Sequence, residues 1–232
     1  MSSIITLANL AGGTSKTTTA HNLSVAFTEY GKKVLLIDLD AKGDLTFILG
    51  KESARVTIAD LLTDKASIDS GVISTPERFD FIPGSSNINN VSQQETFANL
   101  LSKCSPKYDL IVLDTPSTPS TALFMALEVS NSILYPIQLT VSSFRGAHRI
   151  RSLIKPGIKH LAFLKTDSSR NENLEREIMH DFELLDCEIP MSKELLDNES
   201  SSSSVLSSFK NSAISSSYRE LGYSILEKLS LI

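Results

Sequence analysis

The chain has 232 residues, of which 41% are hydrophobic, and a formal net charge of −5 at pH 7. Its two cysteines, Cys104 and Cys187, and the absence of an apolar run of bilayer length argue against a disulfide-stabilised secreted protein and against a membrane-spanning one. We expect residues 1–232 to form a single cytoplasmic domain without a signal peptide, because this length supplies one sizeable core.

The first predicted elements are a strand over 3–9, a turn with two glycines and a helix that begins near Lys16. The turn would direct backbone N–H groups inward and the helix would add its positive end, so the segment could hold phosphate groups. Lys16 would reach the β- and γ-phosphates, and the Thr17 hydroxyl would bind Mg²⁺. Leu10 and Ser15 stand where the P-loop pattern has glycines, so a helix capped by Ser15 is the alternative. The expected phosphate cradle consists of Gly12, Gly13, Thr14, Ser15, Lys16, Thr17 and Thr18.

Two later strands, predicted over 33–38 and 108–114, end in carboxylates. Asp38 and Asp40 mark the end of the first strand, and Asp114 ends the second. Ligands bind where the carboxyl ends of parallel strands meet, and carboxylates at that edge can hold Mg²⁺. For each aspartate taken alone, the alternative is a helix N-cap that follows a strand.

Further strands alternate with helical patterns along the chain, and they are predicted over 79–83, 131–137 and 159–165. This alternation favours an α/β fold with a mostly parallel, twisted sheet and helices on both faces. The polar segment 198–204 is expected to be a loop.

A last helix, predicted over 212–230, has one apolar face. We expect that face to pack on the sheet. A membrane-surface helix would have more cationic flanks than Arg219 and Lys228 provide.

Basic residues concentrate in one stretch of this acidic chain. From Arg145 to Arg176 there are eight basic residues and three acidic ones. Such a segment is the electrostatic footprint expected for a polyanion such as DNA, and a solvated helix face is the alternative.

Six segments, in this order, resemble the ParA/MinD family of deviant Walker-type ATPases over nearly the whole chain. The first two are the cradle and the stretch 37–46, IDLDAKGDLT, which is similar to D-x-D-P-Q-G-N-x-T. Asp114–Ser117 resembles D-x-P-P, and weaker similarities occur at 135–138, 188–190 and 218–221. The resemblance implies a P-loop NTPase fold and a slow ATPase that uses ATP and Mg²⁺. Thr17 and Asp38 would organise the metal with Asp114 nearby, and Asp40 would orient the attacking water.

The chain departs from the family at Ala11, where a lysine normally crosses to the partner's phosphates. The McdA branch, which positions carboxysomes, is similar in lacking this lysine. The resemblance therefore implies that another basic residue acts in trans. The candidates are Arg145, Arg149 and Arg151, followed by Lys42 and Lys155.

The resemblance also implies partners and a location. An ATP-bound homodimer would bind nucleoid DNA without sequence preference through Arg170 and Lys193. It would position a plasmid, chromosome or carboxysome with an adaptor of the ParB or McdB type. The alternatives are a MinD-like ATPase at the membrane surface and an iron–sulfur carrier, which needs two cysteines that can meet at a dimer interface.

Overall fold

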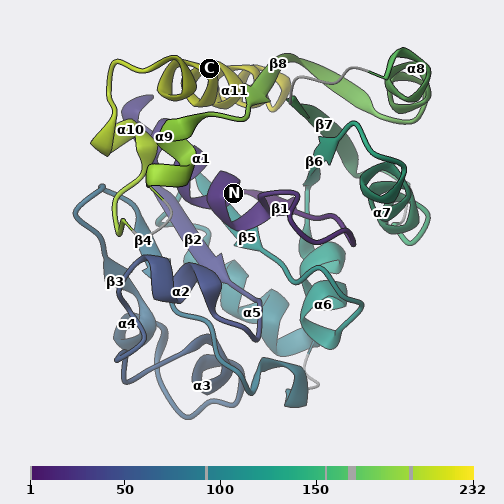
Figure 1. Ribbon diagram of the computed structural model, residues 1–232. Helices are drawn as coiled ribbons and strands as arrows, with labels where there is room; N and C mark the ends of the chain where they lie inside the picture. Colours follow the sequence, from purple (N-terminus) through teal and green to yellow (C-terminus); the bar gives the residue numbers. More distant parts are fainter. Residues whose placement is uncertain (1, 92–93, 155, 167–170, 199–200) are drawn as a thin grey trace.

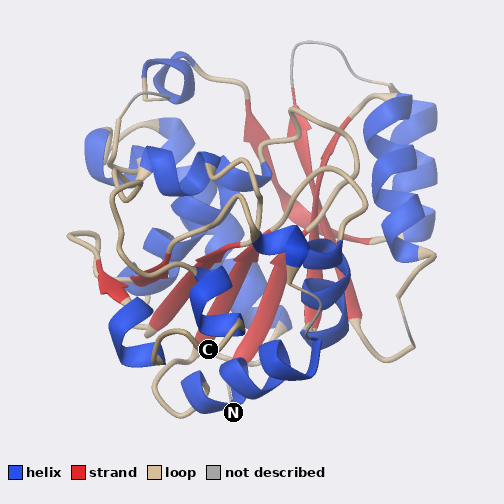
Figure 2. Cartoon of the chain, turned by 90° about the horizontal axis from the view of Figure 1, so that it is seen from below, coloured by secondary structure: helices blue, strands red, loops and turns tan. Residues whose placement is uncertain are grey.

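The computed structural model describes residues 2–91, 94–154, 156–166, 171–198 and 201–232, and in these ranges eight strands form one sheet (Figures 1 and 2). The strand order is β3–β4–β2–β5–β1–β6–β7–β8, and only the pair β3–β4 within that sheet is antiparallel. The bounds are β1 Ser3–Leu7, β2 Val34–Asp38, β3 Ile73–Ser74, β4 Asp80–Ile82, β5 Leu110–Asp114, β6 Ser132–Gln138, β7 Lys159–Thr166 and β8 Glu183–Pro190.

Helices cover both faces of this sheet (Figure 2). On one face α1, α10 and α11 pack together, on the other α3, α5 and α6 lie over β2 and β5, and α7 and α8 cover β6 and β7. The longer helices are α1 Lys16–Glu29, α5 Gln94–Cys104, α6 Thr121–Val129, α7 Val141–Arg151, α8 Glu172–Asp181 and α11 Ala213–Lys228. The short ones are α2 Asp44–Ile48, α3 Ile58–Leu62, α4 Ile68–Gly71, α9 Lys193–Asp197 and α10 Val205–Ser208.

The central strands are continuous apolar runs because both of their faces are covered. In β2, Val34 and Leu36 join the core beneath α1, whereas Leu35 and Ile37 join the core beneath α5. A parallel sheet with helices on both faces needs such strands. The predicted fold class is confirmed, and each of the six predicted strands overlaps a strand of the sheet.

The last helix, α11, packs inside the molecule. Tyr218, Leu221 and Ile225 are fully buried against α1 and β8. A Cβ added at Gly222 would lie 3.1 Å from the Ala26 Cβ, so the two helices approach closely there. The expectation that this helix packs on the sheet is confirmed. In the described ranges, no helix has the length and apolar content that crossing a membrane requires.

Candidate nucleotide-binding site

The segment between β1 and α1 is curled by two residues in the left-handed region. Gly13 has φ +73°, and Ser15 has φ 64° and ψ 33°. Among the described residues, the backbone N–H groups of residues 12–18 donate no hydrogen bond to the protein. The Ser15 side chain makes no capping bond, so the alternative reading as an ordinary capped helix is wrong. The result is a set of free donors at the positive end of α1, the arrangement that binds phosphate.

Two buried carboxylates lie at the carboxyl edge of the sheet, where the parallel strands end. Asp38 and Asp114 are neighbours in the register of β2 and β5, and both are 0% exposed. Asp38 accepts hydrogen bonds from the N–H groups of Asp40 and Thr46, each 3.0 Å, and from the Thr46 hydroxyl at 2.6 Å. Burial raises the pKa of Asp38 to about 6 despite these three bonds.

Asp114 differs because neither of its oxygens has a hydrogen-bond partner of ordinary geometry among the described residues. Burial and the neighbouring Asp38 raise the pKa of Asp114 well above its usual value, against the opposing effects of Thr17 and Lys16. Lys16 is 7% exposed, and burial lowers the pKa of its ammonium group while Asp114 and Asp40 raise it. A buried carboxylate without a partner costs free energy unless a cation or a donor arrives, so the site is built to receive one.

A glycine allows a loop to reach Asp38. A Cβ at Gly84, after β4, would lie 2.7 Å from the Asp38 Cγ. The Gly84 N–H donates to the Thr46 hydroxyl at 2.8 Å, so this loop fixes the hydroxyl that in turn donates to Asp38.

Helix α7 contacts the start of the phosphate loop. The Asn9 amide donates to the carbonyls of Pro136 and Ser143 at 3.0 and 3.1 Å, and its oxygen accepts from the Ala11 N–H at 2.9 Å. A Cβ at Gly146 would lie 2.3 Å from the Asn9 Oδ1 and 2.7 Å from the Ala11 nitrogen. The loop is therefore anchored to β6 and α7 through Asn9, and only glycine fits at the contact.

The basic candidates for action in trans separate into two groups. Arg145 and Arg149 line a cavity of about 350 Å³ that Leu10 and Ala11 also line. Arg151 lies elsewhere, 3.7 Å from Asp181 and over the Phe182 ring. Lys42 is exposed and close enough to Lys16 to lower its pKa, and Lys155 lies outside the described residues.

Residues 2–167 match the AAA domain family. The sporulation initiation inhibitor Soj of Bacillus subtilis is 31% identical over 172 residues, which cover 69% of this chain and 68% of Soj.

The chain belongs to the ParA/MinD family of P-loop ATPases.

Two other relatives are uncharacterised proteins from Methanocaldococcus jannaschii and Mycobacterium tuberculosis. The chain covers 60% and 61% of their lengths. Solved structures give the same fold. MinD of Pyrococcus horikoshii with Mg-ADP has a TM-score of 0.86 at 20% identity, covering 100% of this chain and 98% of that one. An ATP complex of McdA from Cyanothece has a TM-score of 0.80 at 18% identity, covering 97% and 96%.

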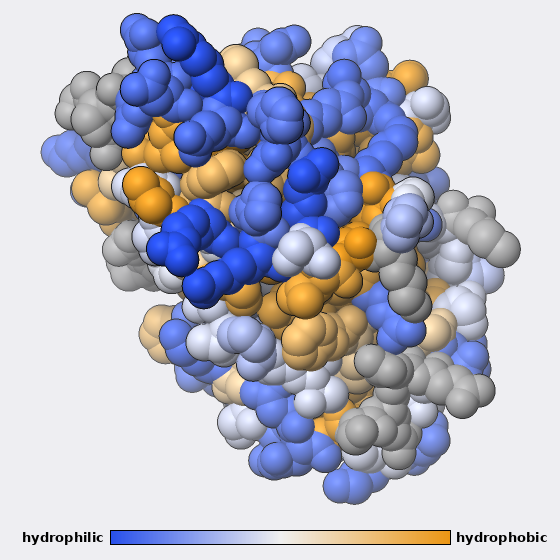
Figure 3. All heavy atoms as spheres, turned by 90° about the vertical axis from the view of Figure 1, so that its right-hand side faces the viewer, coloured by the Kyte–Doolittle hydropathy of each residue, from blue (hydrophilic) through white to orange (hydrophobic). Residues whose placement is uncertain are grey.

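In this ParA/MinD-family chain, the basic segment does not form one surface. Of its described members, Lys165 is buried and Arg151 and Arg176 lie near acidic partners, Asp181 and Glu172. Lys159 lies at the far end of β7. Figure 3 shows the side that carries α7 and α8, where hydrophilic residues gather over the upper part, and α8 itself bears four acidic residues, Glu172, Glu175, Glu177 and Asp181. The described members of this segment therefore do not gather on one surface, and binding of a polyanion through the segment stays a prediction. Arg170 lies outside the described residues, and Lys193 is exposed at the start of α9.

Sequence reasoning missed several residues of the site. Thr46 closes the quoted motif around Asp38 and Pro83-Gly84 is a turn signal, so these two had a signal. Gln138, whose amide donates to the Gly13 carbonyl at 3.1 Å, lies in the weakly similar stretch 135–138, whereas Asn9 and Gly146 act through contacts between distant segments and had no such signal.

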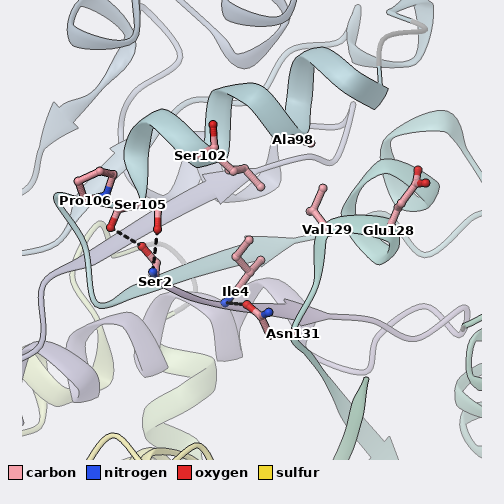
Figure 4. Close-up of a pocket in the computed structure, with 10 residues that line it drawn as sticks. Ser2, Ile4, Ala98, Ser102, Ser105, Pro106, Glu128, Val129 and Asn131 are labelled. Carbon is pink, nitrogen blue, oxygen red and sulfur yellow. Dashed lines mark hydrogen bonds between the residues drawn. The ribbon is translucent and has the colours of Figure 1, made fainter. Parts of the chain in front are cut away.

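A large cavity lies at the opposite end of the sheet and takes no part in this site. It measures about 920 Å³ and lies between α5 and α6, where Ile4, Val129 and Asn131 face it (Figure 4).

The two cysteines lie on opposite faces of the sheet, because Cys187 belongs to the core beneath α11 and Cys104 to the core on the other face. The iron–sulfur alternative therefore has no support.

Proposed function

We propose that the chain is a Mg²⁺-dependent ATPase of the positioning type. The observation that carries this proposal is the placement of Lys16 beside the buried Asp114, whose oxygens have no hydrogen-bond partner of ordinary geometry among the described residues, next to the buried Asp38 and a loop of free N–H donors. These groups suit a polyanion that arrives with a divalent cation.

We assign the proposed roles as follows. The N–H groups of residues 12–18 and the Lys16 ammonium would bind the phosphates, while Thr17 and Asp38 would hold Mg²⁺ with Asp114 beside them. Bound Mg²⁺ would neutralise charge that develops on the phosphates. Asp40 is half-buried and its Oδ1 accepts from the Lys42 N–H at 3.0 Å, so its second oxygen is the one we assign to orienting water.

Lys16→Ala tests the assignment directly. The variant loses a buried charge at the loop, and we expect its affinity for Mg·ATP, measured by calorimetry, to fall at least a hundredfold. Lys107→Ala removes an exposed lysine that pairs with Asp69, and it serves as the matched control. Near-native affinity in Lys16→Ala would contradict the proposed site.

The proposed ATP-bound state is a homodimer in which Arg145 or Arg149 contacts the partner's phosphates. Two nucleotides facing each other concentrate negative charge at a dry interface, and that charge needs a cation from across it. Ala11 supplies none, whereas both arginines lie at a cavity beside Ala11.

The proposed cellular role is to position a plasmid, chromosome or carboxysome on the nucleoid. The dimer would bind DNA phosphates, with Lys193 and Arg170 as candidate contacts, and an adaptor of the ParB or McdB type would stimulate slow hydrolysis. The relatives named Soj support partitioning as the class of function.

A gel shift with duplex DNA of random sequence tests the proposed DNA binding. Retention of the DNA by the protein should require Mg·ATP and should weaken as the salt concentration rises. Retention that is equal without nucleotide would contradict the role.

A further inference from the structure

Gln138 connects the end of β6 to the middle of the phosphate loop. Its side-chain amide donates a hydrogen bond to the Gly13 carbonyl at 3.1 Å. The backbone of this glutamine is held as well, because its N–H donates to the Ser143 hydroxyl at 3.0 Å, and the Asn9 amide donates to the same hydroxyl at 3.3 Å. Gln138 is half-buried at the last position of β6. Its side chain therefore reaches the loop from a backbone that α7 holds in place.

This hydrogen bond acts on a peptide unit that a glycine leaves free to rotate. Gly13 has φ +73°, and glycine adopts either sign of φ with little penalty. The carbonyl of Gly13 and the N–H of Thr14 belong to one peptide unit, and in a trans peptide they point in opposite directions. Rotation of this unit would exchange the two directions. Its orientation therefore decides whether a ligand in the loop meets a donor or an acceptor.

The bond from Gln138 selects one of these orientations. It holds the Gly13 carbonyl toward β6, so the Thr14 N–H points away from β6. Thr14 lies between two residues in the left-handed region, Gly13 and Ser15, and successive N–H groups in such a turn form a concave site for an anion. In the opposite orientation the carbonyl oxygen would face that site, where it would repel a phosphate group.

We infer that Gln138 is a positioning residue, which holds the Gly13–Thr14 peptide so that the Thr14 N–H binds a phosphate of the nucleotide. It acts through the loop, without contact to the ligand. The bond is formed before the nucleotide arrives, and it raises the fraction of molecules whose loop can bind. The apparent dissociation constant falls in proportion. This inference rests on the proposed nucleotide site and identifies what orients one of its donors.

Gln138→Met tests the inference, because methionine keeps the length of the side chain and removes the donor. A hydrogen bond of this kind shifts an equilibrium about fivefold. By calorimetry, we therefore expect Mg·ADP to bind Gln138→Met about fivefold more weakly than the wild type, with the same stoichiometry. A variant that is partly misfolded would instead show a lower stoichiometry and an unchanged dissociation constant.

Tyr30→Phe is the matched control. It also removes one side-chain donor to a backbone carbonyl, that of Arg219 at 3.2 Å, but at the other end of α1. We expect this variant to bind Mg·ADP as the wild type does.

Two calorimetric results would overturn the inference. One is the wild-type dissociation constant in Gln138→Met, whatever its stoichiometry, and the other is an equal weakening in Tyr30→Phe. Absence of Mg·ADP binding by the wild type would instead contradict the proposed function.

Should Gln138→Met melt at a clearly lower temperature than the wild type without nucleotide, NMR of the ¹⁵N-labelled wild type decides. The Thr14 amide proton should move downfield when Mg·ADP binds, because it becomes a donor to a phosphate oxygen. The side-chain amide signals of Gln138 should keep their positions, since the bond to Gly13 is already formed. A Thr14 signal that stays in place, or Gln138 signals that move as far as that of Thr14, would overturn the inference.

Discussion

Asp38 and Asp114 are carboxyl groups in positions where an ionised side chain is costly. Each is a carboxyl group with no exposed surface, and they lie side by side at the ends of adjacent strands. Three donors stabilise Asp38 in its ionised form, yet burial still raises its pKa to about 6. The nucleotide-free protein therefore carries a charge that its own packing disfavours, as is common where a ligand completes the site.

The direction of this shift gives a pH dependence of stability. The native state holds a proton on Asp38 up to about pH 6, whereas in the unfolded chain this carboxyl group has its ordinary pKa of 3.8. The native state therefore binds more protons between these values, and the free energy of unfolding rises as the pH falls from 7 to 5. For the nucleotide-free protein we expect a gain of about 1 kcal/mol from Asp38, measured by urea unfolding at both pH values.

Asp38→Asn should remove this part of the pH dependence, because the amide does not titrate. Asp186→Asn, at an exposed position of β8, is the control and should keep the wild-type profile. An Asp38→Asn variant whose stability changes with pH as the wild type's does would show that other groups cause the effect.

Residue types and spacing predicted the chemistry of the site better than its supports. Lys16, Asp38 and Asp114 can be recognised from the sequence as candidate site residues because each comes at or after the end of an apolar strand. Gly84 and Gly146 do not, since their importance comes from what their missing Cβ atoms would meet, namely Asp38 and Asn9. That information exists only once segments far apart in the sequence are packed together.

Helix α7 also matters through a contact between segments that are far apart in the sequence. Its N-terminal half lies directly on the start of the phosphate loop, and the approach depends on Gly146. Because Arg145 and Arg149 belong to this helix, the contact also sets where both guanidinium groups lie relative to Ala11.

Gly146→Ala should therefore damage the loop more than the fold. The added methyl group would meet Asn9 and the Ala11 backbone, and we expect about 2–3 kcal/mol of destabilisation together with a clear loss of Mg·ATP affinity. Gly222→Ala, where the new Cβ would meet Ala26 in the contact between α11 and α1, is the control. It should lower the melting temperature and leave nucleotide affinity unchanged. Unaltered Mg·ATP binding by Gly146→Ala would contradict the anchoring role of α7.

Two strands escaped prediction for different physical reasons. Strand β3 has two residues and pairs only with β4, so it carries too little pattern to recognise. Strand β8 is an edge strand in which Leu185, Cys187 and Ile189 point inward and alternate with more exposed residues. Its sequence is acidic and lacks the continuous apolar run that makes the interior strands recognisable.

The segment 198–204, predicted as a loop, ends in Ser204, which is buried and donates to Glu77.

At the scale of the whole molecule, every group assigned to the nucleotide comes from one edge of the sheet, so a second subunit can face it only there. This arrangement predicts which charge reversals prevent ATP-driven dimerisation. In an Asp40→Ala background, chosen to slow hydrolysis, sedimentation with Mg·ATP should show a dimer. Adding Arg145→Glu or Arg149→Glu should reduce the dimer at least tenfold for one of the two.

Arg151→Glu is the matched control, because Arg151 lies beside Asp181 on the far side of α7 from the loop. It should dimerise as the background does. If both reversals at Arg145 and Arg149 dimerise normally, the compensating charge comes from another residue, with exposed Lys42 as the next candidate.

The anchoring of Asn9 has a consequence for how the protein is made. The phosphate loop leaves the ribosome before β5 and β6, which are the strands beside β1, and before Pro136 and Ser143, which hold Asn9. At ordinary rates of translation the loop spends roughly ten seconds without these neighbours. ATP therefore cannot template the early stages of folding in the nascent chain. It is captured only after synthesis has passed Ser143 and the sheet has closed around β1.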